Sequence, residues 1–192
     1  MNRLALIFFL MSLWAVALTG CDSNLTDRDG NSYRTVKIGS QTWMAENLKV
    51  RTEGSWCYED KESNCQKYGR LYNWDEAKVA CPAGWHLPSK GEFEALFVAV
   101  GSQDVAGKKL KSISGWGKNG NGDDTFGFSA LPAGDRGSLG YYDVEGYYAY
   151  FWSSSEYNSN YAYYMGLGYD GDKAGLGSYD KIDGFSVRCL KD

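Results

Sequence analysis

The sequence predicts an α+β fold in which two helices pack on short twisted antiparallel strands joined by turns. Glycine and tyrosine are both used heavily, with 24 and 15 residues in a chain of 192, and this composition favours strands and turns over long helices. Two segments nevertheless carry helix start signals. An even number of cysteines follows an export-type leader, which adds the expectation of disulfide staples.

Residues 1–20 are predicted to be an export signal that the mature protein lacks. Arg3 precedes the apolar run LALIFFLMSLWAVAL, which is too short for a stable membrane anchor. The run ends in Leu-Thr-Gly-Cys at residues 18–21. This order resembles the bacterial lipobox, in which the signal is removed before a cysteine that is then acylated, although an ordinary secretory peptide is the alternative. Cys21 is therefore expected to attach the protein to a lipid membrane.

The rest of the chain is predicted to be a polar tether, residues 21–31, and one domain, residues 32–192. A bacterial cell-envelope location follows from the lipid anchor, with the outer membrane favoured over the inner. The formal net charge of −4 makes nucleic acid an improbable partner. Partners are expected to be neutral or uncharged.

Four cysteines remain after Cys21, at positions 57, 65, 81 and 189. In an exported chain they predict two disulfides, and sequence spacing alone permits three pairings. Cys57 and Cys65 bracket the polar segment YEDKESN, so we expect them to pair locally. A zinc site of four thiolates would need paired C-x2-C spacing, which is missing, so no metal and no cofactor is predicted.

Helix signals follow Asn73 and Ser89. Asn73 can cap a helix whose face carries Trp74, Ala77 and Cys81, and Ser89 with Glu92 forms a Ser-x-x-Glu capping box. Between the two helices, Pro82, Gly84 and Pro88 force an extended connection.

Strand-like runs flank the helices on both sides. Residues 33–38 and 41–44 alternate around a Gly-Ser turn and predict a hairpin. Later runs predict strands at residues 126–131, 149–154, 161–168 and 185–190.

Six motifs appear in order: DRDGNSYRTVKIGSQTWMAENL, YGRLYNW, CPAGWHLPS, GFSALPAG, FWSSSE and GFSVRC. They resemble the Fibrobacter succinogenes major paralogous domain, a family of exported bacterial proteins with no established enzymatic activity, which looks like a relative of the C-type lectin-like fold. That resemblance implies a bridge between the first helix and the last strand, Cys81 to Cys189. It would close a loop of about a hundred residues, worth about 4 kcal/mol.

The chain departs from sugar-binding lectins of that fold. It lacks Glu-Pro-Asn, Gln-Pro-Asp and Trp-Asn-Asp triplets, so calcium-dependent sugar binding is disfavoured. Formylglycine-generating enzymes share the architecture, and GFSVRC is similar to their closing strand. Those enzymes use a reactive cysteine pair, whereas Cys189 is better explained as a structural bridge.

His86 is the only histidine in the chain and the first candidate for catalysis. A general base needs a nucleophile or an orienting carboxylate nearby, and its sequence neighbours are turn and cap residues. We therefore expect a surface or hydrogen-bonded structural histidine. Ser89 is expected to cap a helix. The acidic clusters near residues 27–29, 123–124 and 170–172 each supply too few ligands for calcium and are expected to be solvated turns.

The best site hypothesis is the loop from residue 133 to 148. Tyrosine offers a flat apolar face to a sugar ring and a hydroxyl to its edge. The loop carries four tyrosines and two polar neighbours, which are Asp135, Arg136, Tyr141, Tyr142, Tyr147 and Tyr148. The alternative is that these tyrosines cover sheet faces and glycine turns.

The sequence thus predicts a non-catalytic, lipid-anchored binding module that presents tyrosine-rich loops to a glycan or a surface protein. One alternative is an enzyme related to the formylglycine-generating proteins, which would require a free thiol. Another is a structural envelope protein that assembles with copies of itself.

Overall fold

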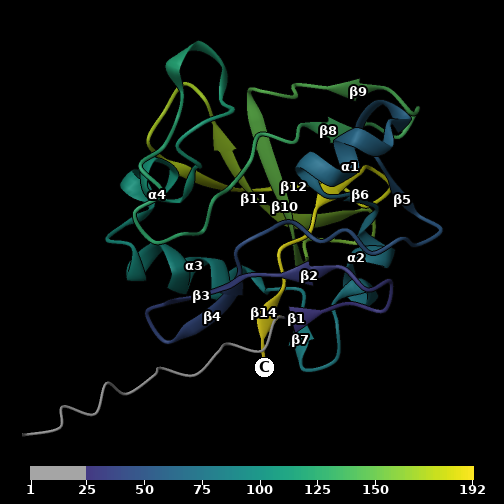
Figure 1. Ribbon diagram of the computed structural model, residues 1–192, viewed down its shortest axis with the longest axis horizontal. Helices are drawn as coiled ribbons and strands as arrows, with labels where there is room; N and C mark the ends of the chain where they lie inside the picture. Colours follow the sequence, from purple (N-terminus) through teal and green to yellow (C-terminus); the bar gives the residue numbers. More distant parts are fainter. Residues whose placement is uncertain (1–24) are drawn as a thin grey trace, which may run out of the picture.

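The computed structural model describes residues 25–192 and has an α+β fold (Figure 1). The export signal and Cys21 lie outside the described residues. Two predicted helices are confirmed, and two further helices make the prediction of a two-helix fold wrong. The four are α1 (Glu62–Tyr68), α2 (Trp74–Ala80), α3 (Lys90–Ala99) and α4 (Gln103–Leu110).

A six-stranded sheet organises the domain in the order β12-β11-β10-β13-β6-β5. Its long strands are β10 (Tyr148–Glu156), β11 (Tyr161–Gly168) and β12 (Ala174–Asp180). Its short strands are β5 (Ser55–Trp56), β6 (Leu71–Tyr72) and β13 (Phe185–Ser186). All pairs are antiparallel except β10 with β13, which run parallel. The prediction of antiparallel strands is therefore confirmed for every pair of this sheet except β10 with β13.

The other strands form three smaller sheets. One has four strands in the order β3-β4-β14-β7: β3 (Thr35–Ile38), β4 (Gln41–Met44), β14 (Leu190–Lys191) and β7 (Trp85–His86). The two-stranded sheets are β1 (Leu25–Thr26) with β2 (Ser32–Tyr33), and β8 (Asp135–Arg136) with β9 (Tyr142–Asp143). The predicted 33–44 hairpin is confirmed as β3 and β4.

Residues 25–31, which the sequence places in the tether, belong to the folded domain. β1 pairs with β2, and the side chain of Asp27 is buried beneath the turn between them. Its carboxylate accepts hydrogen bonds from the backbone of Asp29 and Asn31 and from the Tyr33 hydroxyl. Burial works to raise the pKa of Asp27, and these hydrogen bonds together lower it. The acidic turn is therefore structural.

Side-chain caps start the two predicted helices. The Asn73 side chain accepts the Glu76 N–H at 2.9 Å. Ser89 and Glu92 form the complete capping box that the sequence predicts. The N-cap residues of α1 and α4, Lys61 and Ser102, form no side-chain cap hydrogen bond. Neither is followed three residues later by Glu or Gln, so the capping pattern that identifies the other two helices is missing from them.

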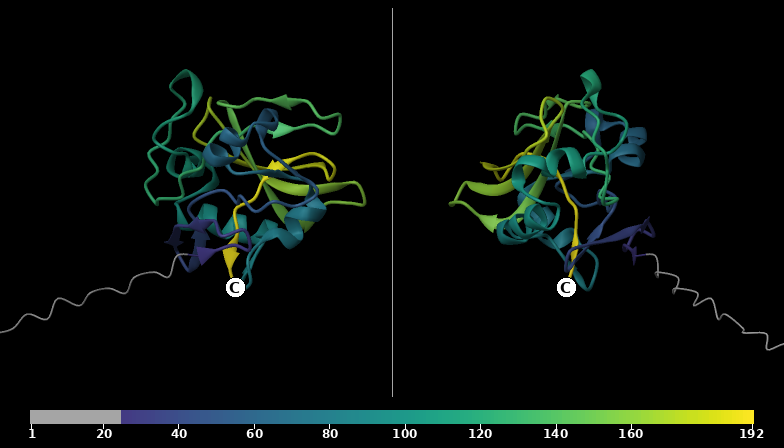
Figure 2. Two further views of the ribbon diagram at one scale, coloured as in Figure 1. Left: turned by 45° about the vertical axis from the view of Figure 1, so that its right-hand side comes forward. Right: turned by 90° about the vertical axis from the view of Figure 1, so that its left-hand side faces the viewer.

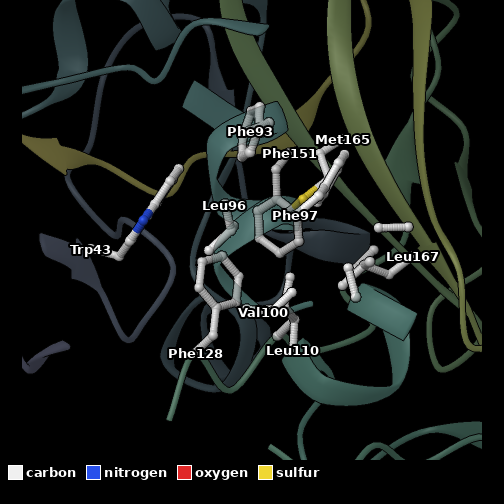
Figure 3. Packing of buried hydrophobic residues seen from close by; sticks show 14 of the residues in the cluster. Trp43, Phe93, Leu96, Phe97, Val100, Leu110, Phe128, Phe151, Met165 and Leu167 are labelled. Carbon is white, nitrogen blue, oxygen red and sulfur yellow. The ribbon is translucent and has the colours of Figure 1, made fainter. Parts of the chain in front are cut away.

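Helices cover both faces of the long strands. α3 and α4 pack on one face, and α2 packs on the other beside β10. Figure 3 shows the larger core, in which three aromatic side chains pack against the apolar side of α3. They are Trp43 of β4, Phe151 of β10, and Phe128 of an irregular segment. The second core gathers around Trp152, which is fully buried.

Both predicted disulfides are present. Cys57 and Cys65 are joined across eight residues. Cys81, at the end of α2, is joined to Cys189, just before β14, across 108 residues. The second bridge ties an early helix to the last strand, as the family resemblance implies.

Arg188, between β13 and β14, lies completely buried beside that bridge. Its guanidinium donates to the side-chain oxygen of Asn47 and to the carbonyls of Met44 and Phe128. Burial lowers the pKa of Arg188 to about 9. These contacts join three segments that are distant in the sequence.

The predicted strand at residues 126–131 is wrong. The segment is irregular because its backbone groups bond to side chains: the Phe128 carbonyl to Arg188, and the Ser129 N–H to Asp124 at 2.7 Å. Ser129 has a φ of 53°, which no strand tolerates. The predicted strand at 185–190 is divided into β13 and β14. Between them, the carbonyls of Val187 and Cys189 accept hydrogen bonds from the backbone N–H groups of Leu48 and Met44.

The two ends of the described chain lie toward the same end of the domain, where β14 pairs with β7 (Figure 1 and Figure 2). The β8–β9 hairpin lies at the opposite end in all three views. Within residues 25–192, none of the helices is long and apolar enough to cross a bilayer.

Candidate ligand-binding site

Four tyrosines share one face of the long strands where α2 does not cover it. We call them the tyrosine platform: Tyr148 and Tyr150 of β10, Tyr164 of β11 and Tyr179 of β12. Side chains two residues apart on a strand point to the same face. The strand register places glycines beside these tyrosines, with Tyr148 opposite Gly168, Tyr150 opposite Gly166 and Tyr164 opposite Gly177.

The glycines give the rings room to lie over the sheet. A Cβ atom added at Gly177 would approach the Tyr164 ring to 2.8 Å, and one added at Gly168 would approach the Tyr148 ring to 3.1 Å. At Gly166 the Tyr164 ring would again be 3.1 Å away. Glycine is otherwise unfavourable inside a strand, so its use here is explained by the tyrosine rings.

The rings are held by contacts with one another. Tyr148 and Tyr150 stack with ring centroids 6.0 Å apart, and Tyr164 stands nearly perpendicular to Tyr150 at 5.4 Å. Beneath them Phe185 lies 5.0 Å from Tyr150, 5.3 Å from Tyr164 and 5.4 Å from Tyr179. The outer sides remain accessible, and Tyr179 is 47 % exposed. The platform is therefore a prearranged aromatic surface.

The β8 strand brings the carboxylate of Asp135 to this platform. Burial, aided by the charges of Asp143 and Asp183, raises the pKa of Asp135 to about 6. Burial raises the pKa values of Tyr150 and Tyr179, and the charge of Asp135 raises them further. Among residues 25–192, no group donates a hydrogen bond to the Asp135 carboxylate. A partly buried acceptor thus lies unused beside the aromatic rings.

Arg136 and Tyr142 of the predicted loop site lie away from the platform. The Arg136 guanidinium stacks 4.0 Å from the Trp56 ring centroid. The Tyr142 hydroxyl donates to Asp60 at 2.6 Å. Burial, and then this hydrogen bond, raise the pKa of Tyr142 to about 12. Both side chains tie the β8–β9 hairpin to the segment before α1.

Tyr141 and Tyr147 are also separated from the platform rings. Tyr141 is 76 % exposed at the tip of the hairpin. The Tyr147 ring packs against Tyr169 at 5.1 Å, with the Lys118 amine 5.7 Å from its centroid. Of the six predicted site residues, the structure therefore brings only Asp135 and Tyr148 to one surface.

Sequence reasoning missed Tyr150, Tyr164 and Tyr179. A signal for them is present in the alternation of tyrosine and glycine, as in YAYF, YYMGLG and AGLGSYD. Alternation places such residues on one strand face. It does not say which strands are neighbours, and this information decides that the three tyrosines meet.

His86 lies between two carboxylates that the sequence analysis did not foresee. Its Nε2 is 2.9 Å from Glu92 and its Nδ1 is 2.7 Å from Asp192. The expectation that no carboxylate orients it is wrong, because the register of β7 with β14 brings Asp192 to it. Glu92 and Asp192 are occupied in linking α3 to the C-terminus through His86, and Ser89 caps α3 as predicted.

This contact predicts a pH dependence of stability. Burial works to lower the pKa of His86, and the hydrogen bonds to Asp192 and Glu92 outweigh it and raise the pKa. The stabilisation is therefore fully present below the unfolded-state value of about 6.5 and is lost as pH rises through the folded-state pKa. We expect wild type, but not His86→Gln, to lose this increment of unfolding free energy as pH rises above about 6.5. Equal losses in urea titrations of both proteins would contradict the assignment.

A possible metal-ligand group in the described part of the chain comprises Cys57, Glu62 and Cys65, whose ligand atoms lie within 4.8 Å of one another. The two sulfurs are joined in a disulfide. The Arg70 guanidinium contacts both of them, and its charge opposes a bound cation. These residues therefore fit a metal poorly.

Comparison with known families identifies the chain. The model of the Fibrobacter succinogenes major domain matches residues 36–191. The chain belongs to this family. The Fibrobacter succinogenes major domain here includes all four helices, both disulfides and the whole tyrosine platform. No curated protein and no solved structure matches the chain.

Proposed function

We propose that this protein is a non-catalytic, lipid-anchored module of the bacterial cell envelope that binds a glycan on the tyrosine platform. The supporting observation is the combination of prearranged tyrosine rings with the Asp135 carboxylate, which lacks a hydrogen-bond donor among residues 25–192. Sugar rings with equatorial hydroxyls have apolar faces that stack on aromatic rings, and their hydroxyls donate to carboxylates. A β-linked oligosaccharide matches both features.

The architecture supports a C-type lectin-like assignment for this module. Cys81 at the end of α2 is bridged to Cys189 near the last strand, and α2 and α3 flank the central strands. The β8–β9 hairpin, which carries Asp135, lies opposite the end of the domain where Leu25 begins the described chain (Figure 2). An acylated Cys21 would thus leave that hairpin facing away from the membrane.

The enzyme alternative required a free thiol. All four cysteines of the described residues are in disulfides, which favours a binding role over chemistry of the formylglycine-generating kind. The nearest approach to a catalytic constellation, around His86, is occupied by helix capping and by the C-terminus.

Replacing Tyr179 with alanine is expected to weaken glycan binding by about fivefold, because an aromatic stacking partner contributes about 1 kcal/mol beyond its buried area. Titration calorimetry with cellohexaose and chitohexaose measures the effect. Asp135→Asn should also weaken binding, since it removes the charge and keeps the shape.

Tyr141→Ala is the matched control, because Tyr141 is equally aromatic, is 76 % exposed and lies outside the platform. It should bind like wild type. Binding that Tyr141→Ala weakens and Tyr179→Ala leaves intact would locate the ligand at the hairpin tip and reject the platform.

A further inference from the structure

The Cys57–Cys65 disulfide lies against a buried positive charge. Arg70 is 9 % exposed, and its Nη1 lies 3.4 Å from the Cys57 sulfur and 3.3 Å from the Cys65 sulfur. Its other nitrogens donate to the hydroxyl and the carbonyl of Ser55, both at 2.9 Å. In the described part of the chain, no carboxylate forms an ion pair with this guanidinium.

This arrangement favours the reduced form of the bridge. A disulfide sulfur is neutral and a weak hydrogen-bond acceptor, so it compensates a buried cation poorly. A thiolate in the same place would accept a charge-assisted hydrogen bond from Arg70. A neighbouring arginine is one of the features that increase the thiolate fraction of a cysteine. Arg70 is therefore better paired after reduction than before it.

Both cysteines are buried, at 7 % exposed for Cys57 and 3 % for Cys65, and they differ in their position beside a cavity. Cys57 lines a polar cavity of about 390 Å³, together with Arg51, Trp56 and Arg70, whereas Cys65 does not line it. A Glu62 carboxylate oxygen lies 3.5 Å from the Cys57 sulfur. An incoming thiolate would thus reach Cys57, and Cys65 would leave as the thiolate beside Arg70.

We propose that the Cys57–Cys65 bridge is a thiol–disulfide exchange site that accepts two electrons from thiol compounds. The first donor thiolate attacks the Cys57 sulfur, forms a mixed disulfide and releases Cys65 as a thiolate. A second donor thiolate attacks the donor sulfur of the mixed disulfide and releases Cys57, which takes up a proton and can donate it in a hydrogen bond to Glu62. The donors leave as their own disulfide. This activity does not depend on glycan binding.

The second bridge provides a reference within the same molecule. Cys189 is fully buried, and Cys81–Cys189 closes 108 residues. A bridge that closes only eight residues contributes less to stability on the chain-entropy model. The Cys57–Cys65 bridge is therefore the one that can open while the domain stays folded.

Redox titration of the full chain in glutathione buffers, followed by alkylation and peptide mass spectrometry, tests the proposal. Cys57–Cys65 should become reduced at a lower ratio of reduced to oxidised glutathione than Cys81–Cys189. Arg70→Met should make Cys57–Cys65 harder to reduce by about tenfold in the exchange equilibrium constant, which corresponds to about 30 mV.

Arg51→Met is the matched control, because Arg51 lines the same cavity and makes no contact with either sulfur. A shift with Arg70→Met no larger than that with Arg51→Met would overturn the proposal. If Arg70→Met does not fold, the alkylation rate of reduced wild type decides the question. A half-maximal rate for Cys65 well below pH 8.5 supports the proposal, and one at the usual value of about 8.5 overturns it.

Discussion

Replacing Arg188 with alanine is expected to reduce the free energy of unfolding by about 3 kcal/mol or more. The side chain is fully buried and serves three acceptor residues in two distant segments: Met44 and Asn47 in one, and Phe128 in the other. Its guanidinium also lies 4.4 Å from the Phe128 ring centroid. Truncation would leave these acceptors without donors and create a cavity among aromatic rings. Urea unfolding followed by tryptophan fluorescence measures the loss.

Arg188→Met separates the polar contribution from the packing. Methionine keeps most of the apolar volume and removes every donor, so it should still destabilise the protein, by less than alanine does. The low pKa of Arg188, about 9, shows that burying its charge is costly. A methionine variant as stable as wild type would mean that this cost cancels the hydrogen bonds, and Arg188 would then have no net stabilising role.

The double variant Cys81→Ala, Cys189→Ala is expected to lose about 4 kcal/mol of stability or slightly more, the chain-entropy value for a loop of about a hundred residues. That loss is a large fraction of the 5–15 kcal/mol typical of a domain. The matched double variant Cys57→Ala, Cys65→Ala should lose less than about 3 kcal/mol, because its loop is much shorter. Thermal unfolding of both variants checks the order. The reverse order would show that the long bridge strains the fold.

The elements that sequence reasoning found are those with local signals. In α2 and α3 the N-cap side chain accepts a hydrogen bond from the backbone N–H three residues later. The β3–β4 hairpin alternates around a Gly-Ser turn. α4 has no side-chain cap and contains Gly107, whose added Cβ would approach the Lys173 carbonyl oxygen to 2.6 Å. Gly107 lowers the helix propensity of this segment. The close packing of α4 on β12 explains why a glycine is needed there.

α1 and β12 were also not predicted, because tertiary contacts and not local sequence signals determine them. α1 begins inside the polar segment that the short disulfide closes and ends at Tyr68, past Cys65, and its start is not capped by a side chain. β12 contains Gly175 and Gly177, which argue against a strand until the Tyr164 ring is seen above Gly177. Local propensity is weak evidence for secondary structure wherever contact with a neighbour in space determines which residue type fits.

Only part of the candidate site was predicted, because the rest of it also depends on contacts between strands. The loop tyrosines were identified by composition, and Asp135 and Tyr148 do lie at the platform. Tyr141 and Tyr142, adjacent in the sequence, have different surroundings: Tyr141 is exposed just before β9, whereas Tyr142 lies in β9 and its hydroxyl donates to Asp60. The pairing of β10, β11 and β12 collects the other tyrosines, and no local pattern contains that pairing.

The most direct test of the proposed platform is a titration of the isotope-labelled protein with cellohexaose or chitohexaose, followed by NMR of the glycine amides. The account predicts saturable shifts at Gly166, Gly168 and Gly177, which lie beside the platform rings, and unchanged signals at the hairpin tip around Gly140. Shifts confined to the tip, or none at the three strand glycines with either sugar, would contradict it.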